Sequence, residues 1–287
     1  MRTASARLLA LALFLFLPAN RAFAQLLAAK DGPIVYGHYH LNVSDAAASQ
    51  KFFVDVLGGV PGKSGTRDLI KFPNALVLFN ARTPTGGSKG TTVDHIGFSV
   101  KDLRQVLNRA KAAGFRIVTA AEAPSNVTVK DDIGVVETGP VTGIAYVMGP
   151  DDVKVELVEM KAQTAPIMSH HVHFTGPQKE MQAWYMQTFG AVAGNSANAA
   201  AFISATLPGL TMNFTPATGT VGTQGRAVDH IGFEVKSLEA FTKQLAAKGI
   251  KLDRPYTAVP AINLSIAFIT DPWGTYIELT EGFDKVQ

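Results

Sequence analysis

Four stretches of the chain alternate apolar and polar residues, and each begins at a histidine. They read HYHLNV from His38, HIGFSV from His95, HVHFTG from His171 and HIGFEV from His230. Because successive side chains of a strand point to opposite faces, this alternation predicts half-buried strands. Each histidine falls opposite the apolar residues, so we expect all four to point away from the packed core.

A segment with helical spacing of apolar residues follows each of these strands and ends at a glycine: Gly58, Gly114, Gly190 and Gly249. Glycine is the usual residue just past a helix end, since it adopts the left-handed conformation at little cost. Strand-like runs such as ALVLFNA and VKVELVEM come after each glycine. The recurrence predicts four copies of one βαβββ module, and therefore an α+β fold.

The segment KAQTAPIM at 161–168 lies between the second and third modules and lacks strong periodicity. It predicts a boundary between two domains of two modules each, at 33–160 and 168–283. The hexapeptide VDHIGF occurs once in each half, at 93–98 and 228–233. An insertion at 118–145 lengthens the second module, and we expect it to form a loop or hairpin over a site.

The first residues resemble an export signal rather than part of the fold. Two arginines precede an apolar run from Leu8 to Leu17, and an Ala-x-Ala sequence ends at Ala24, just before Gln25. This pattern predicts a signal peptide at 1–24 and a secreted or periplasmic protein with no stable membrane span after cleavage; an uncleaved anchor is the alternative.

Composition and charge narrow the range of partners. The signal-like segment holds three arginines and no acid, so its removal cancels the formal net charge of +3. A mature chain without net positive charge gives no electrostatic support for a nucleic-acid partner. The chain has no cysteine, so neither disulfides nor thiolate ligands are available.

Two glutamates complete a pattern typical of metal sites. In the last strand of the second and fourth modules, Glu156 and Glu278 fall opposite the apolar residues, on the face of the histidines. Two imidazoles and one carboxylate on converging strands form a triad that binds Fe(II), Mn, Zn or Ni and leaves positions open. A single strand histidine is more often a hydrogen-bonded residue, but four equivalent ones favour at least one metal site.

Neighbouring histidines leave choices open. In SHHVHF the alternation favours His171 over His170, because Val172 and Phe174 then join the apolar face. His40 and His173 lie two residues further along the same face as the candidate ligands. We interpret them as candidate acid–base groups, with ordinary polar lining as the alternative.

The chain resembles the vicinal oxygen chelate superfamily, which includes glyoxalase I, extradiol dioxygenases, and fosfomycin- and bleomycin-resistance proteins. The resemblance rests on HYHLNVSD, FFVDVLGG, VDHIGFSVKDL, WYMQTFGA, VDHIGFEVKSL and DPWGTYIEL. It implies two glyoxalase/bleomycin-resistance/dioxygenase-like domains whose mixed sheets curl into metal-binding cups. The implied ligands are His38, His95 and Glu156 in one cup and His171, His230 and Glu278 in the other. Pairing across the domains implies instead His38 with His230 and Glu278, and His171 with His95 and Glu156.

Departures from the family pattern bear on the reaction. Glyoxalase I-like sites use a further acidic or amide ligand on the last strand of a module, where this chain offers only Asn80 or Asn213. Tyr146 has the spacing to Glu156 that extradiol dioxygenases favour, while Phe268 takes that place before Glu278.

The resemblance therefore implies a divalent-metal-dependent dioxygenase or glyoxalase-like lyase. Its small-molecule substrate would chelate the ion through two adjacent oxygens, and the protein would be a monomer or homodimer. The alternatives are a binding or sequestering protein without catalysis, and a protein with one catalytic domain and one scaffold domain.

Overall fold

The computed structural model describes residues 26–27, 29, 34–65, 67–194 and 202–285. The predicted signal peptide at 1–24 lies outside these residues. Within the described ranges, no helix has the length and apolarity needed to cross a membrane.

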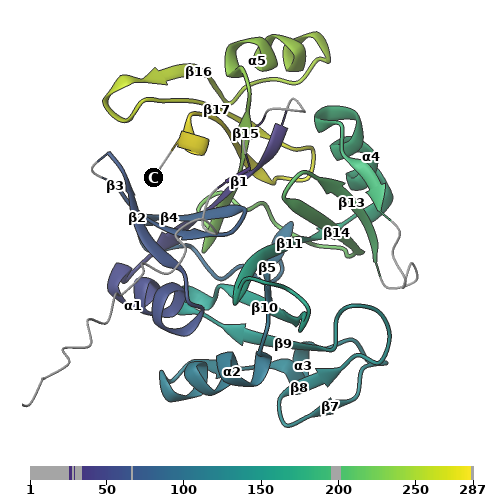
Figure 1. Ribbon diagram of the computed structural model, residues 1–287. Helices are drawn as coiled ribbons and strands as arrows, with labels where there is room; N and C mark the ends of the chain where they lie inside the picture. Colours follow the sequence, from purple (N-terminus) through teal and green to yellow (C-terminus); the bar gives the residue numbers. More distant parts are fainter. Residues whose placement is uncertain (1–25, 28, 30–33, 66, 195–201, 286–287) are drawn as a thin grey trace, which may run out of the picture.

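The predicted α+β fold with four βαβββ modules is confirmed (Figure 1). The first module consists of β1 (Ile34–Val43), α1 (Ala46–Lys51), the π-helical turn η2 (Phe52–Val56), β2 (Val60–Ser64), β3 (Arg67–Phe72) and β4 (Ala75–Ala81). The third consists of β11 (Ile167–Gly176), α4 (Gln178–Phe189), β12 (Val192–Gly194), β13 (Ile203–Leu207) and β14 (Leu210–Pro216).

The other two modules carry the repeated hexapeptide on their first strands. The second consists of β5 (Val93–Val100), α2 (Leu103–Ala112), β6 (Arg116–Ile117), α3 (Thr119–Glu122), β7 (Val129–Lys130), β8 (Ile133–Val135), β9 (Gly143–Met148), η3 (Pro150–Asp152) and β10 (Lys154–Glu159). The fourth consists of β15 (Val228–Val235), α5 (Leu238–Ala247), β16 (Arg254–Val259), η4 (Pro260–Ile262), β17 (Leu264–Thr270), β18 (Tyr276–Glu281) and η5 (Phe283–Lys285).

Helix ends follow the residues expected at them. The carboxylates of Asp45 and Asp102 accept hydrogen bonds from backbone N–H groups in the first turns of α1 and α2, which would otherwise lack partners. At the end of α4, Gly190 takes the left-handed conformation with φ of 74°.

The modules pair across the two halves of the chain. One sheet has the order β16-β17-β18-β15-β1-β4-β3-β2 and unites the first and fourth modules. The other has the order β12-β13-β14-β11-β5-β10-β9-β8-β7, with β6 on β9, and unites the second and third modules. The segment at 161–168 thus separates two sequence repeats, but it connects modules within one sheet.

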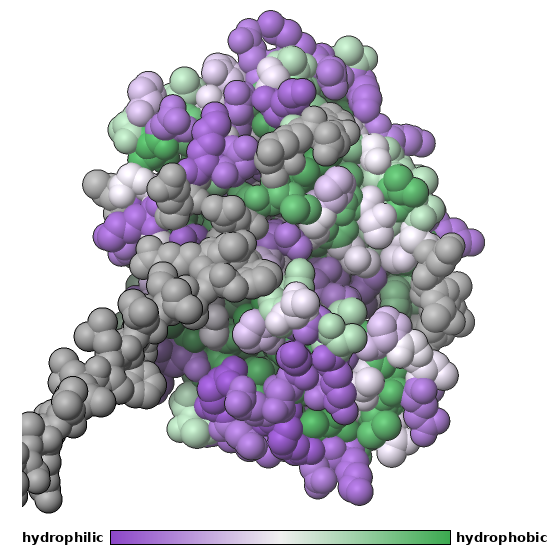
Figure 2. Space-filling model, viewed as in Figure 1, coloured by the Kyte–Doolittle hydropathy of each residue, from purple (hydrophilic) through white to green (hydrophobic). Residues whose placement is uncertain are grey.

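Both sheets turn their helix-covered faces to one shared core. Aromatic rings from the two sheets touch there, as Tyr39 and Phe72 do with Phe98, and Phe189 at the end of α4 contacts Phe233 of β15. Figure 2 shows mostly hydrophilic side chains on the lower part of the molecule, where α2 lies in Figure 1. The opposite, concave faces of the sheets hold the histidines.

Candidate metal centres

The first cup lies at the centre of the eight-stranded sheet, where β1 and β15 pair antiparallel. His40 lies opposite His230, and His38 lies opposite Gly232. Strand β18 runs parallel to β15 and places Glu278 beside Gly232. Glu278 Oε2 is consequently 2.9 Å from His38 Nε2 and 3.0 Å from His230 Nε2.

The second cup repeats this arrangement in the ten-stranded sheet. His173 lies opposite His95, His171 lies opposite Gly97, and Glu156 lies beside Gly97 on the parallel strand β10. Glu156 Oε2 is 2.9 Å from His95 Nε2 and 3.1 Å from His171 Nε2.

The structure therefore brings together the crossed ligand sets. It does not bring His38 to His95 and Glu156, nor His171 to His230 and Glu278. The reason is that each His-x-His strand, β1 or β11, pairs with a His-x-Gly strand from the other half of the chain. Both His-x-Gly strands have the sequence VDHIGF, so local pattern alone does not distinguish the two pairings.

The glycine of each His-x-Gly strand makes room for the facing imidazole. A Cβ atom on Gly97 would lie 2.1 Å from His171 Cε1, and one on Gly232 would lie 2.0 Å from His38 Cε1. Carbon atoms pack at about 3.5–4.0 Å, so no larger residue fits without moving the ring. This role of the repeated glycine was not recognised in the sequence, although its place two residues after the histidine was visible.

A further histidine joins each cup. The donor atoms of His38, His40, His230 and Glu278 all lie within 4.8 Å of one another, and the same holds for His95, Glu156, His171 and His173. His40 Nδ1 lies 3.8 Å from Glu278 Oε2, while its Nε2 lies 3.0 Å from Asn80 Oδ1. His173 Nε2 similarly lies 2.7 Å from Thr215 Oγ1. Among the described residues, Nδ1 of His40 and Nδ1 of His173 are buried without a hydrogen-bond partner.

Asn80 is one of the two amides considered as metal ligands. In the structure it orients the ring of His40. Its carbonyl oxygen accepts a hydrogen bond from the His40 Nε2–H group, which leaves a lone pair on Nδ1 directed toward Glu278. The expected roles of His40 and His173 in proton transfer remain predictions, and their geometry suits metal donors equally well.

An aspartate beside each His-x-Gly histidine fixes the orientation of its ring. Asp94 Oδ1 lies 2.9 Å from His95 Nδ1, and Asp229 Oδ2 lies 2.7 Å from His230 Nδ1. The alternation predicts Asp94 on the apolar face, and that prediction is wrong. A register shift leaves Asp94 and Asp229 outside the strand pairing, and such a bulge redirects a side chain next to a site.

A second register shift, between Ser169 and His171, resolves the choice in SHHVHF. It leaves His170 outside the pairing and places its Nδ1 2.8 Å from His171 Nδ1. His171 contacts Glu156, as the alternation predicts, whereas His170 contacts the other side of the His171 ring.

Electrostatics favour ionised carboxylates in both cups. Burial opposes the charge of Glu278, but hydrogen bonds with His230 and His38 hold its pKa well below the usual value. Burial likewise opposes the charge of Glu156. The electrostatic attraction of His171 and the hydrogen bond with it nevertheless hold the pKa of Glu156 well below the usual value.

The pKa shifts of four cup histidines differ in direction, two downward and two upward. Burial lowers the pKa of His40 to about 4 and the pKa of His173 well below its usual value, so both rings are neutral near pH 7. For His95 and His230, burial is outweighed by hydrogen bonds to the adjacent aspartate and the cup glutamate, and the pKa is raised.

The donor sets fit a transition-metal ion. Bonds of about 2.0–2.2 Å to a shared ion place neighbouring donor atoms roughly 3 Å apart, close to the separations of 2.9–3.1 Å around each glutamate. Three imidazoles and one carboxylate suit Zn, Fe, Mn or Ni, whereas Ca²⁺ and Mg²⁺ prefer all-oxygen sites. Aspartate and amide partners on the far ring nitrogens are the usual support for such ligands.

Tyr146 lies beside the second cup, as its spacing predicts. It pairs with Glu156 across β9 and β10, and its ring centroid is 5.5 Å from that of His95. Burial and the nearby Glu156 carboxylate raise its pKa, so the phenol stays protonated and acts as a hydrogen-bond donor. Lys154 lies 5.2 Å from the Tyr146 ring centroid and 2.7 Å from Asp94 Oδ1.

The insertion at 118–145 contains the predicted hairpin, formed by β7 and β8 at the edge of the ten-stranded sheet. Its apolar side chains pack on the concave face around Tyr146, Ile144 and Val158. The insertion therefore covers part of the second cup.

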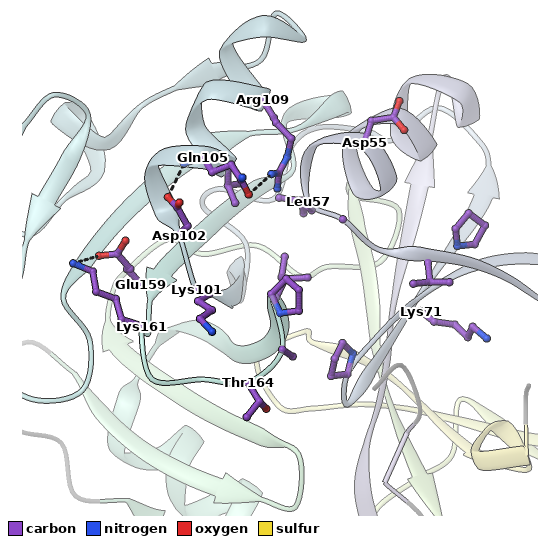
Figure 3. A pocket seen from close by; sticks show the side chains of 18 of the residues that line it. Asp55, Leu57, Lys71, Lys101, Asp102, Gln105, Arg109, Glu159, Lys161 and Thr164 are labelled. Atoms are coloured by element: carbon purple, nitrogen blue, oxygen red, sulfur yellow. Dashed lines mark hydrogen bonds and ion pairs between the residues drawn. The ribbon is translucent and has the colours of Figure 1, made fainter. Parts of the chain in front are cut away.

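A cleft of about 1610 Å³ lies elsewhere, between η2, α2 and the 161–168 segment (Figure 3). None of the candidate ligands line it. Two of its charged groups have partners within the protein: Lys161 lies beside Glu159, and Arg109 donates a hydrogen bond to the Val56 carbonyl oxygen. We therefore interpret this cleft as the junction between the first two modules and not as part of a metal centre.

Comparison with models of protein families identifies the superfamily of this chain. The model of the Glyoxalase/Bleomycin resistance protein/Dioxygenase superfamily matches residues 35–157 and again residues 126–279. The chain belongs to this superfamily. No curated protein sequence matches it.

Solved structures of this superfamily share the fold over most of the chain. A glyoxalase I variant from Zea mays is 18% identical with a TM-score of 0.66, covering 90% of this chain and 95% of that one. Glyoxalase I from Zea mays is 17% identical with a TM-score of 0.64, covering 88% and 94%. A putative dioxygenase from Bacillus subtilis is 12% identical with a TM-score of 0.60, covering 88% and 87%. At these identities the likeness concerns the fold alone.

Proposed function

We propose that this chain is a divalent-metal-dependent enzyme, of the dioxygenase or lyase/isomerase type, acting on a small substrate that chelates the ion through two adjacent oxygens. The observation that carries the proposal is the pair of buried donor sets, each with three imidazoles and one ionised carboxylate within 4.8 Å. Several buried histidines facing one carboxylate are a costly arrangement without an ion to bind.

The bound ion would act as a Lewis acid that stabilises negative charge on a chelated oxygen. His38, His40, His230 and Glu278 would hold one ion, and His95, His171, His173 and Glu156 the other.

Around the Glu156 cup, the chain's own groups would orient the substrate. Tyr146 keeps its proton and would donate a hydrogen bond to a substrate oxygen. The apolar side chains of the 118–145 insertion would exclude water from that side of the cup.

The segment at 1–24 supports the further proposal that the protein is exported, to the periplasm or the medium. Like the oligomeric state, this is independent of the two cups. Comparison of the N-terminal sequence of protein recovered from outside the cytoplasm with the start at Gln25 tests it.

Metal analysis tests the central proposal. Untagged protein purified without chelator is expected to contain about two equivalents of one transition metal, and a chelator is expected to abolish turnover of catechol and 2-oxo aldehyde probes. The alternative function is that of a binding protein without catalysis. It is favoured if the protein binds aromatic probes such as catechol with no metal present. Activity that survives complete metal removal would contradict the proposal.

A further inference from the structure

The two cups have matching ligands but different walls. Strand register defines the equivalent positions: Leu78 lies beside His40 on β4, and Asn213 lies beside His173 on β14. In the same way Leu76 lies beside His38, and Thr211 beside His171. At these two positions the β4 wall of the Glu278 cup is therefore apolar and the β14 wall of the Glu156 cup is polar, whereas the next position, Asn80 or Thr215, is polar in both.

The strand next to each wall shows the same contrast between apolar and polar side chains. Leu69 pairs with Leu78 on β3, and Ser204 pairs with Asn213 on β13. Across the cup, Phe268 faces Glu278 where Tyr146 faces Glu156. At four equivalent positions the Glu278 cup has a hydrocarbon side chain and the Glu156 cup a hydroxyl or amide: Leu69 and Ser204, Leu76 and Thr211, Leu78 and Asn213, Phe268 and Tyr146.

Burial of the side chains differs in the same sense at two of these four positions. Leu76 and Leu78 are 1% and 0% exposed although they lie on a concave face, because a second layer of apolar side chains covers them. Thr211 and Asn213 are half-buried.

The covering layer of the Glu278 cup includes Phe283 of η5. Its ring centroid lies 5.2 Å from that of His38, and its residue is 3% exposed. In Figure 1 the yellow η5 segment lies between the β17 end and the β2–β4 end of the sheet. The corresponding position five residues after Glu156 is Lys161, whose side chain is 69% exposed and lies in the cleft of Figure 3.

Glu234 holds the Phe283 segment in place. Its carboxylate accepts hydrogen bonds from the Gly282 N–H group at 2.5 Å and from Thr280 Oγ1 at 2.6 Å. The equivalent residue of the second module, four residues after its histidine, is Ser99, which cannot provide such an anchor.

We propose that the two centres have different roles: the Glu156 cup admits small polar chelating ligands, and the Glu278 cup is closed by Phe283 and holds an ion that such ligands do not reach. This inference rests on the proposed function, because it needs a metal ion in each cup. It identifies Asn213, Ser204, Thr211 and Tyr146 as the residues that would select an oxygen-rich substrate.

Cobalt(II) with acetohydroxamate, a small polar chelator with two adjacent oxygens, tests the proposal. The His230→Ala variant keeps only the Glu156 centre, and the His95→Ala variant keeps only the Glu278 centre. The visible bands of bound cobalt(II) report ligand binding without turnover. We expect acetohydroxamate to shift the bands of the Glu156 centre and to bind the Glu278 centre at least about tenfold more weakly, since that cup must open first.

Further variants test separately the closure of the Glu278 cup by Phe283 and the polarity of the Glu156 cup. Phe283→Ala in the His95→Ala background is expected to restore a band shift, whereas the matched Lys161→Ala change in the His230→Ala background should alter nothing. Because Phe283→Ala removes a buried ring, Asn213→Leu at a half-buried position provides a second test, and it should weaken acetohydroxamate binding to the Glu156 centre.

Two cobalt centres with equal affinities for acetohydroxamate would overturn this inference and leave the proposed function standing. A folded Phe283→Ala protein whose Glu278 centre stays unresponsive, together with an Asn213→Leu protein that binds normally, would overturn it as well. A chain that binds no cobalt(II) at all would overturn the proposed function and this inference together.

Discussion

Substitution of Gly97 by alanine tests the packing on which each centre depends. The added Cβ would lie 2.1 Å from His171 Cε1, whereas carbon atoms require about 3.5 Å, so the ring must retreat by about 1.4 Å. A metal–nitrogen bond tolerates displacements of only about 0.2 Å. We therefore expect Gly97→Ala to lose His171 as a ligand and to empty the Glu156 centre, while the Glu278 centre stays filled.

The same change at Gly232 should act on the other centre alone, because its Cβ would lie 2.0 Å from His38 Cε1. Overpacking of this kind costs about 1–3 kcal/mol in the metal-free protein, which leaves most proteins of this size folded.

The assay is metal content after dialysis against a weak chelator, combined with thermal unfolding in the presence and absence of metal. Ser99→Ala, two residues along the same face of β5, is the matched control and should keep two equivalents of metal. Full occupancy and unchanged affinity in both Gly97→Ala and Gly232→Ala would refute the reasoning, since the imidazoles then cannot lie where the structure has them.

Three other predictions concern groups around the centres. Asp229→Asn should reduce metal affinity of one centre by about 10- to 100-fold in a competition titration, because a neutral amide replaces the charged carboxylate that accepts the hydrogen bond of His230 Nδ1 and fixes its ring. Asn80→Ala should weaken the same centre by about tenfold or more, because His40 Nε2 loses its partner. Burial raises the pKa of Glu234 above its ordinary value of 4.5, so the folded state holds the proton more tightly. The free energy of unfolding should therefore fall as pH rises from 4.5 through this raised pKa, and denaturant titrations of Glu234→Gln should lack that dependence.

The repeated modules and the ligand types could be predicted from the sequence because they depend on local pattern. Period-two alternation places His38, His95, Glu156 and Glu278 opposite the apolar residues, and packing of that apolar face is sufficient to fix the direction of the side chains. The same alternation correctly prefers His171 to its neighbour.

The pairing of modules could not be predicted, because it depends on contacts between strands far apart in the chain. The two VDHIGF strands offer the same histidine and the same glycine to either partner strand, so both pairings satisfy local rules. Bulges are invisible to alternation for a similar reason. Asp94 moves beside His95 only because its strand pairs with β11 across a register shift.

The difference between the two cups also depended on structure. Asn213 and Leu78 are equivalent only through their strand partners, and Phe283 reaches His38 because η5 folds back over the concave face.

Metal content of two double variants tests most directly the claim that each centre combines ligands from both halves of the chain. His38→Ala with Glu278→Gln removes two ligands from one centre and should leave about one equivalent of metal in the other. His38→Ala with Glu156→Gln damages both centres and should leave none. The reverse result, with metal retained in the second double variant and lost in the first, would contradict the crossed arrangement.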